Sequence, residues 1–309
     1  TQSNAKRRWR ASPCCRRGTA NGCDTCSVTQ IIAALSLKGG VGKTSVVLGL
    51  AGSAAERGLR VLIVDLDPQA NSTSSLDPVR TPYTTSDVLF DGREGVAGDA
   101  IVASGWDSLI SLIPSERALE HRATPNGQDS SHRLRRALTG VTDKFDLVLI
   151  DCPPSLGELT RNALYAATDA LVVTEPSFFA VNGAEQALEA VSIVATHGNP
   201  GLRPIGIVAN RVRPTLPEHN YRMDELRSAF GELVLGGLPD RAAIQQAQGA
   251  CVPVQRWTSN GAADINLALD KLLDALRPMT KQADLRTIQT RPSLISVNNA
   301  ARTAEGSRS

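Results

Sequence analysis

The stretch that decides the fold of this chain is Lys38-Gly39-Gly40-Val41-Gly42-Lys43-Thr44-Ser45. It follows an apolar run at residues 31–35 and leads into residues 46–51, from which helical periodicity continues to Gly58. A strand, a glycine-rich loop and a helix in this order are the context that a phosphate-binding loop requires. Glycines let backbone N–H groups close around phosphate oxygens, and the positive end of the new helix faces the anion.

The loop differs from the plain pattern G-x-x-x-x-G-K-[ST], which places a glycine where this chain has Leu37. A second lysine, Lys38, opens the loop instead. Lys43 is placed to reach the β- and γ-phosphates of a nucleotide, and the Thr44 hydroxyl to ligate Mg²⁺. The alternative is a glycine turn whose lysines serve only solubility. Two glycine-flanked lysines between a strand and a helix favour nucleotide binding over it.

Two further apolar runs end in aspartates. Residues 61–64 precede Asp65-Leu66-Asp67, and residues 147–150 precede Asp151. Four consecutive apolar residues predict strands buried on both faces of a parallel sheet, and open α/β sheets bind their ligands at the carboxyl ends of such strands. We therefore expect an α/β fold, a mostly parallel twisted sheet with helices on both faces, in which these carboxylates meet the loop.

Three motifs in the same order resemble the deviant Walker A group of P-loop ATPases: K-G-G-x-G-K-T, D-L-D-P-Q-A-N at 65–71 and D-C-P-P-S at 151–155. That group includes the ParA/Soj partition proteins, MinD, the nitrogenase iron protein, the arsenite-pump ATPase and the Mrp scaffolds. The resemblance covers about residues 29–277 and implies a Mg²⁺-dependent ATPase. The cofactors that the resemblance implies are ATP and Mg²⁺.

The resemblance also implies roles for single residues. Lys38 reaches the nucleotide across a dimer interface and takes part in catalysis. Asp67 is the second catalytic residue, which orients or deprotonates the attacking water. Thr44, Asp65 and Asp151 hold or support Mg²⁺. Asn210 contacts the adenine edge, for which an Asn cap or turn is the alternative, and Pro239 belongs to a base-side loop. The residues implied in nucleotide binding are Lys38, Gly39, Gly40, Val41, Gly42, Lys43, Thr44, Ser45, Asn210 and Pro239.

The charge of the 309 residues is uneven. The net charge is only +2, but residues 1–30 carry six basic residues against Asp24, and residues 277–309 carry six against Asp284 and Glu305, so the part between them is acidic. Four cysteines, Cys14, Cys15, Cys23 and Cys26, lie in the first segment. We expect residues 1–28 to be a disordered or artefactual extension, 29–277 an ATPase domain and 278–309 a disordered tail. Whether Cys23 and Cys26 bind a metal is open.

Nothing in the sequence resembles a signal peptide or a run of about 18–20 apolar residues, so a cytoplasmic protein is expected, nucleoid-associated if it binds DNA. Other members of the group need features that we do not find, such as a terminal amphipathic helix, cysteines at a dimer axis, a C-terminal Cys-x-x-Cys or a tyrosine cluster. The remaining interpretation is a DNA partitioning ATPase for a chromosome or plasmid.

By that resemblance, ATP drives formation of a sandwich homodimer that binds DNA without sequence preference, and a centromere-binding, ParB-like adaptor stimulates hydrolysis. The alternatives are a nucleotide-gated scaffold with little hydrolysis and a MinD-like positioning ATPase. A DNA contact must come from a local patch or from the tails, because the middle of the chain is negative. Candidate arginines are Arg211, Arg213, Arg222, Arg227, Arg241 and Arg256, each of which has a solvated face as its alternative.

Overall fold

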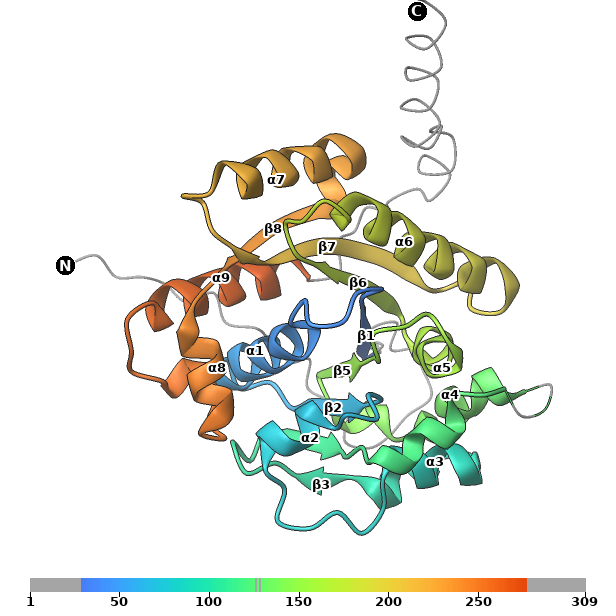
Figure 1. Cartoon of the computed structure of the whole chain (residues 1–309). Coiled ribbons are helices and arrows are strands. Elements are labelled where there is room, and N and C mark those ends of the chain that lie inside the picture. The colour runs from blue at the N-terminus through green and yellow to red at the C-terminus, as the bar shows by residue number, and fades with distance from the viewer. Residues whose placement is uncertain (1–28, 126, 128, 277–309) are drawn as a thin grey trace, which may run out of the picture. The chain divides into compact units, whose positions relative to one another are not determined.

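One sheet of eight strands, in the order β3-β4-β2-β5-β1-β6-β7-β8, organises the computed structural model, which describes residues 29–125, 127 and 129–276 (Figure 1). All neighbouring strands are parallel except β3 and β4. The strands are β1 (Gln30–Leu35), β2 (Val61–Asp65), β3 (Val102–Ala103), β4 (Ile110–Ile113), β5 (Leu147–Asp151), β6 (Asp169–Thr174), β7 (Arg203–Val212) and β8 (Val234–Pro239).

Helices cover both faces of the sheet, with α1, α8 and α9 on one side and α4, α5 and α6 on the other (Figure 1). The α-helices are α1 (Lys43–Glu56), α2 (Asn71–Leu76), α3 (Thr85–Asp91), α4 (Arg133–Leu138), α5 (Glu158–Ala166), α6 (Ala180–His197), α7 (Pro217–Phe230), α8 (Ala242–Gly249) and α9 (Ala262–Ala275). The fold class expected from the sequence is confirmed. No helix within the described part of the chain combines the length and apolar character that a bilayer crossing requires.

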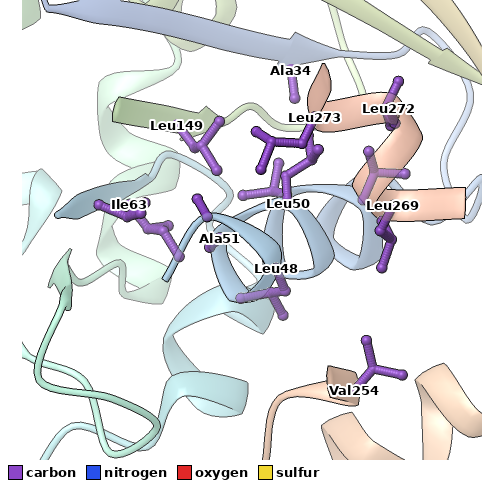
Figure 2. Packing of buried hydrophobic residues seen from close by; sticks show 14 of the residues in the cluster. Ala34, Leu48, Leu50, Ala51, Ile63, Leu149, Val254, Leu269, Leu272 and Leu273 are labelled. Atoms are coloured by element: carbon purple, nitrogen blue, oxygen red, sulfur yellow. The ribbon is translucent and has the colours of Figure 1, made fainter. Parts of the chain in front are cut away.

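Helix α1 lies at the centre of the hydrophobic core (Figure 2). Leu50 and Ala51 are buried toward the central strands, on the side of Leu149 and Ile63, whereas Leu48 points toward Val254. On its other side the helix meets α9, whose Leu269, Leu272 and Leu273 are also buried. A helix that is apolar on all sides in this way is a buried helix, and its first turn is therefore fixed in place from several directions.

Glycines set how closely α1 approaches its neighbours. A Cβ atom at Gly49 would lie 2.7 Å from both Cδ atoms of Leu269, and one at Gly52 would lie 2.1 Å from Gln255 Oε1. The Gln255 amide donates to the Gly49 carbonyl at 3.0 Å. The helix that begins at the glycine loop thus packs closely against the carboxyl-terminal third of the described chain.

Several elements were not expected from the sequence. Helices α2, α5 and α8 and the short strand β3 were not predicted. The terminal segments 1–28 and 278–309, including the cysteines at 14, 15, 23 and 26, lie outside the described residues, so the expectations for them stay predictions.

Candidate functional site

The carboxyl ends of β1, β2 and β5 come together beside the glycine loop. Strand β5 lies between β2 and β1, and the register places Asp65 at the end of β2 directly beside Asp151 at the end of β5. Asp151 is also paired in register with Ala34 of β1, four residues before Lys38 opens the loop. The expected meeting of carboxylates and loop at one edge of the sheet is therefore present.

The backbone of the loop depends on two glycines with positive φ. Gly40 has φ of +81° and Gly42 has φ of +82°, a region that L-residues rarely adopt. Gly42 is the N-cap of α1, and no side chain caps the helix there. A Cβ atom at Gly42 would lie 2.2 Å from Asn210 Nδ2. The loop thus needs glycine for both conformation and space, and it leaves the first N–H groups of α1 without a capping side chain.

Three side chains converge on the buried carboxylate of Asp151. Lys43 Nζ lies 3.0 Å from Oδ1, while the hydroxyls of Thr44 and Ser72 each donate to Oδ2 at 2.8 Å. Burial lowers the pKa of Lys43, but the nearby Asp151, Cys152 and Asp67 raise it, and the result lies above the ordinary value. Lys43 is therefore a buried cation, 6% exposed, whose charge is balanced by Asp151.

Asp65 and Asp67 have different surroundings. Both oxygens of the fully buried Asp65 are engaged: Oδ1 accepts from the Asp67 amide at 3.1 Å, and Oδ2 accepts from the amide and hydroxyl of Thr73 at 2.9 and 2.7 Å. Burial and the neighbouring Asp151 raise the pKa of Asp65 to about 7. In this structure Asp65 holds the turn into α2, and its expected support of Mg²⁺ stays a prediction.

Asp67 faces a cavity. Its side chain is 6% exposed, and its Oδ1 accepts from the Gln69 amide at 2.9 Å. Burial raises its pKa, an effect opposed by the Gln69 N–H group and by Lys43. A carboxylate with a raised pKa beside a basic loop is suited to accept a proton.

Lys38 forms an ion pair with Glu175 at the end of β6. The Lys38 side chain is 56% exposed and Glu175 is 23% exposed. Lys38 is thus held at the edge of the site within one chain, by a partner that the sequence did not indicate.

A cavity of about 320 Å³ lies over the loop, within the range of ligand pockets. It is lined by the loop and first turn of α1, by the segment from β2 into α2, and by single residues from later in the chain. The lining residues are Lys38, Gly40, Val41, Gly42, Lys43, Thr44, Ser45, Asp67, Asn71, Ser74, Ser75, Pro154, Arg211 and Gln248. The cavity does not include the predicted residues Gly39, Asp65, Asp151, Asn210 and Pro239 in its lining.

The residues present fit a nucleotide with Mg²⁺. Within the described residues, no cluster of three or more His, Cys, Asp or Glu side chains is arranged to hold a metal ion alone. Mg²⁺ needs no such cluster, because it is usually held by one or two protein oxygens together with substrate phosphates. Thr44 and Asp151 offer hard oxygen atoms next to the lysine, and the glycine backbone leaves room for the anion.

Asn210 and Pro239 lie apart from the cavity lining. Asn210 is buried, and its amide donates to the Val41 carbonyl at 2.9 Å and to the Gly42 carbonyl at 3.4 Å. Pro239 ends β8 and pairs in register with Val212. In this structure Asn210 holds the loop through these two bonds, and the base contacts of both residues stay predictions.

Five of the six candidate DNA-contacting arginines are in ion pairs. Arg213 pairs with Asp240, Arg222 with Glu218 and Glu225, Arg227 with Asp224, Arg241 with Asp264, and Arg256 with Asp107. The sixth, Arg211, lines the cavity. These side chains therefore form mostly charge-balanced surface pairs.

Sequence reasoning missed Ser72, Glu175 and Gln248. Ser72 and Gln248 belong to helices that were not predicted, and Glu175 lies directly after β6. Ser72 and Glu175 bond Asp151 and Lys38, and Gln248 bonds the Ser45 hydroxyl at 3.2 Å. Cys152, which follows Asp151, is fully buried.

Known protein families and single proteins are similar in sequence to this chain. A family model described as an AAA domain matches residues 29–203. The sporulation initiation inhibitor protein Soj of Bacillus subtilis is 37% identical over 184 residues, which cover 58% of this chain and 71% of Soj. The chromosome partitioning protein ParA of Caulobacter vibrioides is 34% identical over 234 residues, which cover 73% of this chain and 86% of that protein.

Solved structures share the fold. Cobyrinic acid a,c-diamide synthase from Mycobacterium smegmatis, crystallised with ADP and magnesium, matches with a TM-score of 0.66 at 30% identity, over 82% of this chain and 98% of that chain. An ATP complex of McdA from Cyanothece matches with a TM-score of 0.70 at 22% identity, over 83% of this chain and 99% of that chain. At 22% identity the second likeness concerns the fold alone.

Proposed function

Because the chain belongs to the AAA domain family and, within it, to the ParA/Soj-type partition ATPases with a deviant Walker A loop, we propose that it is an ATPase that acts with Mg²⁺ in DNA segregation. The observation that carries the proposal is the convergence of Lys43, Thr44 and Ser72 on Asp151 beneath the glycine loop. The domain that performs this function spans residues 29–277.

The residues of the loop bind the nucleotide. Backbone N–H groups of the loop and first turn of α1 donate to phosphate oxygens. With nucleotide bound, Lys43 would pair with the β- and γ-phosphates in place of Asp151, and Thr44 and Asp151 would hold the metal, with Asp65 supporting them. When bound, Mg²⁺ supplies positive charge that stabilises the transferring phosphoryl group. Asn210 and Pro239 serve the base side of the site.

Hydrolysis is assigned to Asp67 and Lys38. Asp67 lines the cavity, and its carboxylate orients the attacking water and accepts its proton. Lys38 leaves Glu175 and stabilises phosphate charge in a second copy of the chain, so that ATP drives formation of a sandwich homodimer. A centromere-binding, ParB-like adaptor stimulates turnover and returns the protein to its free state.

DNA binding without sequence preference completes the cycle. The ion pairs of five candidate arginines give little support to a patch on the described surface, whereas the basic terminal segments supply positive charge. Gel shifts of the full chain with and without ATP test this step. Binding that needs ATP and weakens steeply with salt is the expected result, and binding at low salt that ignores ATP contradicts it.

A second candidate is a nucleotide-gated scaffold that hydrolyses little. Leu37, in the place of the usual loop glycine, favours it, because the loop departs there from the plain pattern. Turnover measured with DNA and adaptor separates the two functions, comparing wild type with Asp67→Ala and Lys43→Ala. We expect Asp67→Ala to bind ATP and dimerise without turnover, and Lys43→Ala to lose the nucleotide. Normal hydrolysis by Asp67→Ala removes the catalytic assignment, and a wild type that binds but never turns over supports the scaffold.

A further inference from the structure

We propose that Arg211 is a nucleotide-positioning residue, which contacts the α-phosphate and nucleoside half of a nucleoside di- or triphosphate. The inference rests on the proposed nucleotide binding and deepens it. It also takes Arg211 out of the set of DNA-contacting candidates, because Arg211 lines the cavity over the glycine loop.

The backbone at Arg211 is unusual. Arg211 has φ of +57°, one of four positive values at non-glycine residues among the described residues. The pairing of β7 with β8 shifts register in the same place, since Ala209 pairs with Gly237 but Val212 pairs with Pro239. An extra residue in a strand is a β-bulge, and bulges next to functional sites redirect a side chain. A left-handed conformation at a bulky residue costs free energy and points to a function.

The bulge brings two consecutive side chains to the same loop. In a regular strand, neighbouring side chains point to opposite faces. Here Asn210 donates to the Val41 and Gly42 carbonyls, and Arg211 borders the cavity that the same loop forms. Asn210 thus fixes the end of β7 against the loop, and Arg211 is left to face the ligand.

The sheet order separates Arg211 from the reacting end of the site. Asp151 and Asp67 come from β5 and the end of β2, on one side of β1, whereas Arg211 comes from β7, beyond β6 on the other side. Around the first turn of α1, Thr44 likewise faces Asp151 and Ser45 faces Gln248, which lines the cavity with Arg211. Because Lys43 and Mg²⁺ define the β- and γ-phosphate end, Arg211 belongs to the other half of the nucleotide.

The charge of Arg211 is available to a ligand. Its guanidinium forms no ion pair or hydrogen bond with any residue that the structure describes, in contrast to the five other candidate arginines. A planar guanidinium forms bidentate hydrogen bonds with phosphate and stacks on planar groups. The α-phosphate offers oxygen atoms for such hydrogen bonds, and the base offers a planar group for stacking.

Arg211→Gly is the variant that tests the inference, because glycine adopts φ of +57° without strain and the turn is preserved. Binding of MgADP and of a slowly hydrolysed MgATP analogue is measured by calorimetry on the full chain. Loss of one charge-assisted contact weakens both affinities by roughly 10- to 100-fold. The unfolding midpoint without nucleotide stays equal or rises, which a purely structural role for the arginine does not predict. Arg211→Lys restores part of the affinity.

Arg213→Gln is the matched control, since this exposed arginine two residues away pairs with Asp240 outside the cavity. It leaves both affinities unchanged. Unchanged affinities in Arg211→Gly overturn the inference. A loss of affinity for the ATP analogue alone also overturns it, because that result assigns Arg211 to the γ-phosphate. A wild type that binds neither nucleotide removes the proposed function itself, and the inference with it.

Discussion

Lys43 Nζ lies 3.0 Å from Asp151 Oδ1, and both side chains are buried beneath the glycine loop. The pair joins the first turn of α1 to the end of β5, so the loop proposed to bind phosphate is linked electrostatically to the strand that ends in the proposed metal ligand. In the proposed cycle the phosphates replace Asp151 as the partner of Lys43, and Asp151 becomes available to the metal.

Removal of Asp151 alone should destabilise the protein strongly. Asp151→Ala leaves the Lys43 charge buried without a partner, and breaking a buried ion pair costs about 3–5 kcal/mol. Urea unfolding without nucleotide measures the loss. The double variant Asp151→Ala/Lys43→Met should recover part of it, because no charge is then left unpaired. A double variant as unstable as Asp151→Ala would show that the pair itself is not the cause.

Neutralising Glu175 should release Lys38 at little cost in stability. The pair is partly exposed, and such pairs contribute about 0–1 kcal/mol. If Lys38 acts across the dimer, Glu175→Gln should strengthen ATP-dependent dimerisation by up to about fivefold, the equivalent of 1 kcal/mol. Sedimentation with ATP and without it provides the measurement. Glu185→Gln on α6, an exposed glutamate, is the control, and weaker dimerisation in Glu175→Gln would argue that the pair supports the dimer.

Gly49 and Gly183 should respond in opposite directions to the same substitution. At Gly49 a new Cβ atom lies 2.7 Å from Leu269, so Gly49→Ala overpacks the contact between α1 and α9 and destabilises by about 1–3 kcal/mol. At Gly183 in α6 nothing lies within 4 Å, so Gly183→Ala stabilises by about 0.5–1 kcal/mol through helix propensity. Chemical denaturation of both variants tests the pair. Equal effects would mean that α9 does not pack on α1 as described.

Cys152 should be unreactive in the folded protein. Burial raises the pKa of its thiol to about 12, against a smaller lowering by Lys43. At pH 8 the thiolate is therefore almost absent, and reagents cannot reach it. Cys251 is half-buried at the rim of the site and should be alkylated much faster. Peptide mapping by mass spectrometry after brief labelling distinguishes the two residues. Equal labelling of both in the native state would contradict the burial of Cys152.

Strands β1, β2 and β5, which border the site, could be predicted because each is a short run of apolar residues. The strands that end at Asp65 and Asp151 needed no tertiary information, since four consecutive apolar residues indicate burial on both faces. Helices α2, α5 and α8 escaped prediction because they are short, at six, nine and eight residues, and hold too few apolar positions to show a helical period. Ser72 and Gln248 were missed with the helices that carry them.

The sequence by itself determined the phosphate loop, its two lysines and the order of the acidic strands, because glycine spacing and apolar runs are local properties of the chain. Only the tertiary structure decided which carboxylate meets Lys43, that Glu175 holds Lys38, and that Arg211 faces the cavity while its neighbours in the list of arginines pair with acids. The Lys43–Asp151 and Lys38–Glu175 contacts join residues 108 and 137 positions apart. These contacts and the place of Arg211 depend on strand order and on a bulge in β7, and neither can be read from local patterns of hydrophobicity and charge.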